Sequence, residues 1–260
     1  MDCRRRLWPV DRLYDFVSTV GGRWENALRK STIIAGLLPI VAVLFLLAAK
    51  TSTARVTSPK PDLSGVWAGP QEATTFGPGE PPMQAWARNA FSQIKPSYGP
   101  HAAPDSQDPV LVCLPPGMPR ILLMPFPMKI VQTPDEVIML FEYDHFQRQI
   151  FLNREEHPKD LKLTYMGDSI GHWENDTLVV DTIGLTDKSW LDQVGHPHSG
   201  ALHITERIRR VDHETLVDDL TFDDSKDYSA RWTGQQIFKL RPGWQLLEYI
   251  CEDHMDLPSR

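Results

Sequence analysis

The segment 190–206 is the best candidate in this chain for side chains that bind a metal ion or move a proton, because it combines three histidines with two carboxylates. Neutral imidazoles and carboxylates are good ligands for zinc or iron. In an extended chain, His196 and His198 point in the same direction, as metal ligands of the His-x-His type do. The candidate residues in this segment are Asp192, His196, His198, His203 and Glu206.

The same histidines have a second interpretation, because Pro197 bends the chain between His196 and His198 and breaks their shared direction. They then belong to a loop in which imidazoles bond to backbone carbonyls. The chain contains no HExxH spacing that would support a zinc site. We therefore expect no cofactor, with zinc or iron at His196, His198 and His203 as the alternative.

A general acid–base site is the second kind of chemistry that the residue types allow. A histidine beside a carboxylate is a usable base near neutral pH. Asp181, however, alternates with Val180 and Thr182, so it equally suits the wet face of a strand. No G-x-S-x-G motif, phosphate loop or catalytic cysteine signature is present, and the prediction leans away from an enzyme. The residues expected to converge in such a site are His145, Asp181, Asp192, His196 and Arg207.

The strongest single signal lies elsewhere, in the uncharged apolar stretch at 31–49. Nineteen helical residues with a rise of about 1.5 Å nearly span the roughly 30 Å core of a bilayer. Residues 1–30 carry seven Lys or Arg and four Asp or Glu, a net charge of +3, which places this amphipathic tail in the cytoplasm. The alternative is a cleaved signal peptide, but its apolar region would be shorter than this one.

The part of the chain beyond residue 50 is then predicted to lie in the periplasm of a bacterium, behind an inner-membrane anchor. The whole chain has a net charge of −7, so residues 31–260 carry −10, which argues against nucleic acid as a partner. Cys113 and Cys251 are both on this oxidising side and most simply pair with each other, whereas Cys3 stays a cytoplasmic thiol. The bridge would connect the front of the domain to its last strand.

The predicted periplasmic domain, 62–260, follows a linker at 50–61. It has two parts that differ in amino-acid composition. Fifteen of the 22 prolines lie between Pro59 and Pro127, so 62–128 is expected to wrap in extended segments around one helix at 82–95. From 129 to 254 the residues are β-branched and aromatic, with turn residues between the runs. The expected strands are 129–133, 137–143, 146–153, 172–174, 177–183, 202–211, 215–222, 235–240 and 245–251.

Consecutive hairpins without alternating helices predict a mainly β fold, an antiparallel up-and-down barrel or a curved meander. Gly65-Val66-Trp67 resembles the opening of calycins and lipocalins, which implies that Trp67 closes the floor of the barrel. Other motifs resemble a family of exported bacterial proteins of no established activity, over residues 62–254. These motifs are Pro96-Ser-Tyr-Gly-Pro100, Cys113-Leu-Pro-Pro-Gly-Met-Pro-Arg120, Trp173-Glu-Asn-Asp-Thr-Leu-Val-Val-Asp181 and Trp190-Leu-Asp-Gln-Val-Gly-His-Pro-His-Ser199.

The long basic tail and the span depart from that family, whose members carry an ordinary export signal. This departure favours recruitment to a membrane site, with other membrane-protein subunits and the bilayer as partners. The first functional hypothesis is an accessory subunit of a larger bacterial photosynthetic or respiratory complex. The second is a tethered exported enzyme or small-ligand binder with a His/Asp site in the barrel mouth.

Overall fold

The computed structural model describes residues 60–99 and 102–254, all within the second of two compact units, Thr57–Arg260. The predicted cytoplasmic tail at 1–30 and the predicted span at 31–49 lie outside the described residues. Within the described ranges, no helix is both long enough and apolar enough to cross a membrane.

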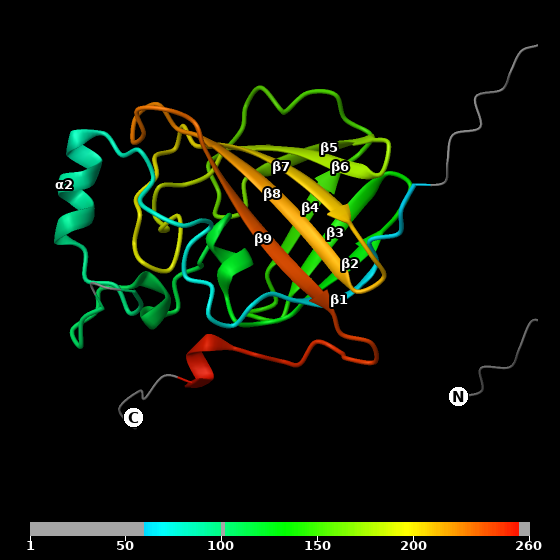
Figure 1. Ribbon diagram of the computed structural model, residues 1–260, viewed down its shortest axis with the longest axis horizontal. Coiled ribbons are helices and arrows are strands. Elements are labelled where there is room, and N and C mark those ends of the chain that lie inside the picture. The colour runs from blue at the N-terminus through cyan, green and yellow to red at the C-terminus, as the bar shows by residue number, and fades with distance from the viewer. Residues whose placement is uncertain (1–59, 100–101, 255–260) are drawn as a thin grey trace, which may run out of the picture. The chain divides into compact units, whose positions relative to one another are not determined.

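Nine strands close into a single barrel in which each strand neighbours the next in the chain and β9 returns to β1 (Figure 1). The predicted barrel is therefore confirmed. The strands are β1 Gly65–Ala68, β2 Met128–Gln132, β3 Glu136–Phe141, β4 Gln147–Phe151, β5 Asp168–Glu174, β6 Thr177–Ile183, β7 His203–Arg210, β8 Thr215–Asp223 and β9 Trp232–Leu240.

The barrel is mixed, and the prediction of purely antiparallel strands is wrong at one place. β4 and β5 pair in parallel, with Ile150 opposite Ser169 and Phe151 opposite Ile170. A closed ring with an odd number of strands cannot alternate direction throughout, so nine strands require at least one parallel pair. The crossover 152–167 supplies the long connection that a parallel pair needs.

The predicted strand at 245–251 is also wrong. β9 already pairs with β1, with Trp67 opposite Leu240, so no barrel edge remains for a further strand. The segment instead runs irregularly along the barrel, with one isolated bridge between Tyr143 and Tyr249, into the 3₁₀ helix η3 Cys251–His254. The other expected strands are present: 177–183 has the expected ends, at least one end of each of the rest is shifted, and β5 and β9 are longer than expected.

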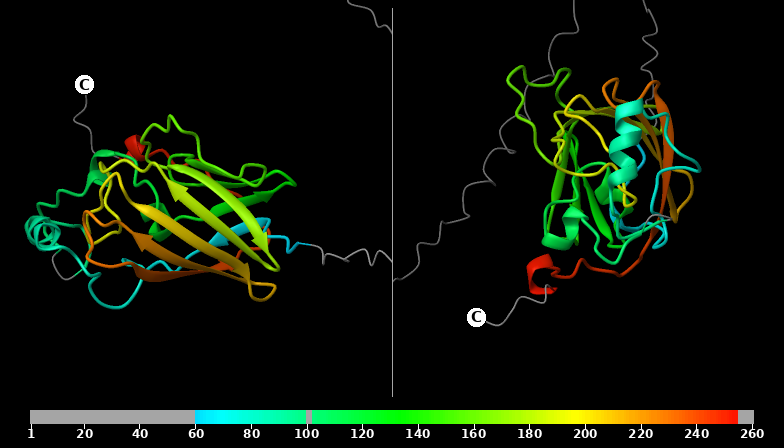
Figure 2. Two further views of the ribbon diagram at one scale, coloured as in Figure 1. Left: turned by 90° about the horizontal axis from the view of Figure 1, so that it is seen from above. Right: turned by 90° about the vertical axis from the view of Figure 1, so that its left-hand side faces the viewer.

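The long connection between β1 and β2 carries the predicted helix, shortened to α2 Ala85–Gln93, and the 3₁₀ helices η1 Pro109–Val112 and η2 Arg120–Leu123. Only Ala87 of α2 is buried. α2 lies beyond one end of the barrel, at the same end as the loop between β6 and β7 (Figures 1 and 2). The proline-rich region thus covers one barrel end.

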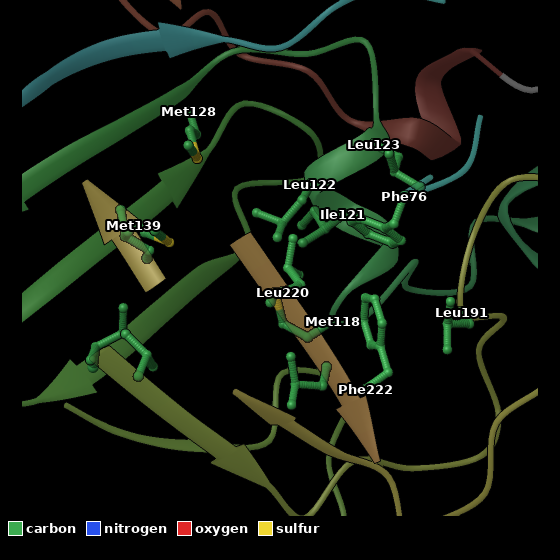
Figure 3. Close-up of a cluster of buried hydrophobic side chains, with 14 of the residues drawn as sticks. Phe76, Met118, Ile121, Leu122, Leu123, Met128, Met139, Leu191, Leu220 and Phe222 are labelled. Atoms are coloured by element: carbon green, nitrogen blue, oxygen red, sulfur yellow. The ribbon is translucent and has the colours of Figure 1, made fainter. Parts of the chain in front are cut away.

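Side chains of η2 close that end. All four residues of η2 are buried, and the Leu122 carbonyl accepts a hydrogen bond from Gln236 Nε2 of β9 at 3.4 Å. Figure 3 shows Met118, Ile121 and Leu122 among Leu220, Phe222 and other core side chains. The barrel mouth is filled by the chain itself.

Trp67 is fully buried on β1, and its Nε1 donates to the Leu63 carbonyl at 2.9 Å. The guanidinium of Arg210 lies 5.3 Å from the centre of the Trp67 ring. The tryptophan thus packs into the core of the barrel.

A buried ion pair crosses the barrel interior between Arg148 of β4 and Glu206 of β7. The Arg148 guanidinium donates to both carboxylate oxygens of Glu206, to Ser169 Oγ at 3.1 Å and to Thr182 Oγ1 at 2.8 Å. Ser169 and Thr182 also bond to each other at 2.9 Å. Nearly every polar group of the pair is satisfied, as buried charges require.

Asp218 of β8 lies beside this pair and is itself buried. Burial, the neighbouring Glu206 carboxylate and a hydrogen bond with Glu206 raise the pKa of Asp218 well above its usual value, against the opposing effect of Arg148. The carboxyl is therefore held neutral and donates its proton to Glu206. Of the two carboxyl groups beside Arg148, Asp218 is thus the neutral one.

Asp218→Asn is expected to stabilise the barrel at pH 7, because the amide donates to Glu206 without having to hold a proton. The folded pKa of Asp218 is raised, so the wild-type protein loses stability as pH rises above about 4, where unfolded aspartate ionises. The advantage of the variant should grow from near zero at pH 4 by up to about 1.4 kcal/mol per pH unit. Urea unfolding of both proteins at a series of pH values measures this difference, and a difference independent of pH would contradict the protonated carboxyl.

Candidate functional site

The loop 184–202 between β6 and β7 carries the candidate residues and is fixed by hydrogen bonds to distant parts of the chain. The Gln193 backbone N–H donates to the Thr74 carbonyl at 3.1 Å, and its Nε2 donates to the carbonyls of Ala73 and Leu123. One glutamine thus connects this loop to the segment after β1 and to η2. The loop is a positioned element on the filled barrel end.

Asp192 folds the next four residues around its carboxylate. Its Oδ1 accepts from the backbone N–H groups of Val194, Gly195 and His196 at 3.1, 3.1 and 3.2 Å. Its Oδ2 lies 2.6 Å from His196 Nδ1. A carboxylate only accepts hydrogen bonds, so Nδ1 carries a hydrogen, and Nε2 accepts whenever the ring holds this one hydrogen alone.

Gly195 is required for this turn. Its φ is +94°, and a Cβ at this position would lie 2.6 Å from Cγ2 of Ile94, just beyond the end of α2. The turn therefore packs directly against the region after the helix, which no residue with a side chain permits without a shift.

His196 is buried, and its ring stacks on Phe91 of α2 with centres 4.3 Å apart and planes 15° apart. Its Nε2 is covered and has no hydrogen-bond partner among the described residues. His196 and Phe91 both line a cavity of about 320 Å³. The other lining residues are Thr74, Thr75, Gly77, Gly79, Glu80 and Val194.

The cavity offers few polar groups. Glu80 is held in an ion pair with Arg88 at 2.7 Å, and Thr75 Oγ1 donates to the Gly77 carbonyl at 3.0 Å. No Lys or Arg is among the lining residues. The site thus combines largely apolar walls with one histidine oriented by a carboxylate.

His198 has a structural role in the same loop. Burial lowers the pKa of His198, so the imidazole is neutral. Its Nδ1 lies 3.2 Å from the Ser199 carbonyl and must donate there, which leaves Nε2 to accept from Ser189 Oγ at 3.2 Å. Both ring nitrogens are therefore used.

His203 lies on the outer face of β7, where its Nε2 contacts Asp181 Oδ1 at 2.8 Å. His157 of the crossover approaches the same oxygen at 3.2 Å. Thus His196, His198 and His203 have three different sets of partners, and the described part of the chain contains no group of three or more His, Cys, Asp or Glu placed to hold a metal ion. The structure does not bring the predicted zinc or iron ligands together.

The predicted acid–base residues meet only in part. Asp192 and His196 form a pair, whereas Asp181 faces outward. Arg207 is exposed and pairs with Glu174 at 2.9 Å, and His145 is exposed in the turn between β3 and β4. Convergence of all five in the barrel mouth is wrong because β6 and β7 present Asp181 and Arg207 on the outer face.

Phe91 and the threonines of the cavity were not predicted as site residues. Phe91 belongs to the apolar stripe expected for the helix 82–95, a pattern that indicates core packing and carries no signal for a site. Thr74 and Thr75 lie in an irregular proline-rich segment without periodicity. Only the folded contact between this segment and the loop 184–202 reveals the cavity.

The disulfide between Cys113 and Cys251 is confirmed, with Cα atoms 5.6 Å apart. It joins the end of η1 to η3 rather than to a last strand. The loop of 138 residues that it closes contains all strands from β2 to β9.

These features define a class of protein: a closed, filled β-barrel with an oriented His–Asp pair beside a small cavity at one end. No family model, no curated protein and no solved structure matches this chain. The resemblance to exported bacterial proteins therefore stays a prediction.

Proposed function

We propose that this protein is a membrane-anchored accessory subunit that stabilises a larger integral-membrane complex of a bacterial photosynthetic or respiratory chain. In this proposal the stretch 31–49 spans the inner membrane, the basic tail lies in the cytoplasm and the barrel lies in the periplasm. The partners are other membrane-protein subunits and the bilayer.

The observation that carries the proposal is the exposure of four apolar side chains that lie within four residues of Cys113 or Cys251 along the chain. Val112 and Leu247 are 62% and 68% exposed, and Leu111 and Leu114 are also exposed. We call these four residues the disulfide patch. Exposed apolar residues near a disulfide that joins their two segments favour an interaction with another protein.

The disulfide patch is held rigidly. Asp108 accepts the Val110 N–H at 3.1 Å as the N-cap of η1 and also binds Arg120 in a buried bidentate pair at 2.8 and 2.6 Å. The disulfide fixes the other side, where the Cys251 N–H donates to Asp144 Oδ1 at 2.6 Å. A surface that is ordered before binding loses little entropy on association, which supports a docking role.

The filled barrel supports the same proposal. η2 occupies one barrel end, and the Arg148–Glu206 pair crosses the interior. Carriage of a ligand inside the barrel would require this core to be displaced. A rigid, filled barrel suits a structural part of an assembly better.

Replacing both Val112 and Leu247 with glutamate in the full chain is expected to detach the protein from its partners, because two charges would enter an apolar interface. The measurement is native electrophoresis of membranes solubilised in mild detergent, with immunodetection of the protein. The wild type should migrate with a complex much larger than its own 29.6 kDa.

Val211→Glu is the matched control, because Val211 is 51% exposed in the turn between β7 and β8, away from the disulfide. This variant should still migrate with the complex. A wild-type protein that migrates alone would overturn the accessory role, and equal migration of all three proteins would exclude the disulfide patch as the docking surface.

A second candidate function is a tethered enzyme or small-ligand binder. The observation that favours it is the Asp192–His196 pair, whose Nε2 lacks a partner among the described residues beside a cavity of about 320 Å³. An oriented imidazole in a mostly apolar pocket suits the recognition of a small molecule.

A further inference from the structure

We propose that the cavity beside His196 binds a small neutral molecule that has an apolar body and one O–H or N–H group, which donates a hydrogen bond to His196 Nε2. This inference rests on the second candidate function and is independent of the accessory role. It assigns the direction of the hydrogen bond in the site: the ligand donates and His196 Nε2 accepts.

The direction of this hydrogen bond follows from Asp192. Its carboxylate accepts from His196 Nδ1 at 2.6 Å and from three backbone N–H groups, so the imidazole tautomer and the ring orientation are both fixed. Of the two ring nitrogens, only Nε2 remains to face a ligand, and in the neutral ring it accepts. Ligands with a donor are therefore favoured over ligands that only accept.

The charge of the ligand follows from the surroundings. The carboxylate of Asp192 lies behind the ring, and Glu80 is the charged residue among those lining the cavity. Because no cationic side chain lines the cavity, an anionic ligand would lose its hydration without a counter-charge. A carboxylate or phosphate is therefore disfavoured, and a neutral alcohol, phenol or indole fits.

The energy of recognition comes from two sources. Phe91 and Val194 supply apolar contact area in a cavity at the small end of the usual range for ligand sites. A buried acceptor without a partner is costly, so a ligand that donates to Nε2 removes that cost. Because Nε2 is covered, binding also requires a side-chain adjustment of the kind common at binding sites.

Phenol and anisole form the first test, because they share a ring and differ in the presence of the donor. Full-length protein in detergent, labelled with ¹⁵N-histidine, is titrated with each compound while the His196 Nε2 resonance is followed. Phenol should bind about fivefold to tenfold more tightly and shift that resonance, as one hydrogen bond predicts. Thr74→Trp, which fills the cavity and leaves the Asp192–His196 pair intact, should abolish binding of both compounds.

Asp192→Asn provides the decisive test, because it is expected to shift the preference. The three backbone N–H groups hold the side-chain oxygen of the asparagine, so its NH₂ group faces His196 Nδ1 and donates. Nδ1 then accepts, and the hydrogen moves to Nε2, which becomes a donor. The affinity of acetophenone, which only accepts, should rise relative to that of phenol in the variant, whose Nε2 donates, whereas the wild type should prefer phenol.

The same ratio of acetophenone to phenol affinity in the wild type and in Asp192→Asn would overturn the proposal, as would the absence of phenol binding to the wild type. If Asp192→Asn fails to fold, the phenol and anisole comparison with Thr74→Trp decides alone. Migration of the protein with its complex is measured separately, so failure of this site leaves the accessory role untouched.

Discussion

Glu206→Gln is expected to lower the free energy of unfolding by about 3–5 kcal/mol at pH 5, the usual cost of leaving one buried charge without its partner. Arg148 would keep its contacts with Ser169 and Thr182 but would lose the only ionised carboxylate beside it in the interior, since Asp218 is held neutral. A loss of this size is a large part of the 5–15 kcal/mol that stabilises an ordinary domain. Chemical unfolding followed by tryptophan fluorescence measures it.

The loss should shrink as pH rises. Without the negative charge of Glu206, the pKa of Asp218 falls, and its ionised carboxylate replaces the missing partner of Arg148. Adding Asp218→Asn to Glu206→Gln should remove this recovery. Replacing both members of the pair, Arg148→Met with Glu206→Leu, should restore most of the stability, because no charge is then buried. A loss below about 1 kcal/mol for Glu206→Gln would indicate that water reaches Arg148.

Replacing both Cys113 and Cys251 with serine is expected to cost about 5 kcal/mol in the chain-entropy description, because the bridge closes a loop of 138 residues. Losses of 2–5 kcal/mol are typical when such a bridge is removed. Urea unfolding of the wild type and the double variant measures the difference. The Arg120–Asp108 pair and the Cys251 N–H bond to Asp144 remain in the variant, and each should hold its own segment in place in the folded state.

A reducing agent provides the control for the disulfide. It should destabilise the wild type by the same amount as the double substitution and should leave the double variant unchanged. A difference below about 1 kcal/mol between oxidised and reduced wild type would mean that the unfolded chain is little constrained by the bridge.

Much of the barrel was predictable from alternation along the strands. Residues 177–183 were placed with the correct ends, and the neighbouring strands within a few residues. Closure was not predictable, because the partner of an edge strand lies far away in the sequence. That is why the apolar and aromatic residues of 245–251 predict a strand although β1 already occupies the edge of β9.

The sequence carries a signal for the interior ion pair. Glu206 lies two residues from both Ile204 and Ile208, so all three side chains point to the same face of the strand, inside the barrel. Arg148 has the same relation to Ile150, and Asp218 to Leu216 and Leu220. A charged residue at a core position of a strand therefore predicts a buried partner, but the sequence does not say which strand supplies it.

The candidate site was half predictable. The segment 190–206 and the pair of Asp192 and His196, four residues apart, were recognised from residue type and spacing. Whether Pro197 separates His196 from His198 depended on the fold of a loop without regular structure. The sequence alternation allows Asp181 either in an acid–base site or on the solvent-facing side of its strand. The structure places it on the solvent-facing side, in contact with His203.

The parallel pairing of β4 with β5 affects how the two parts of the barrel are held together. Only two residue pairs join these strands, and only two join β1 with β9, so the barrel consists of two strips, β1–β4 and β5–β9, that meet along two short edges. Arg148 stands at one of these edges and reaches across it to Ser169, Thr182 and Glu206 of the other strip. A side chain thus supplies much of the cohesion that the backbone ladder lacks there.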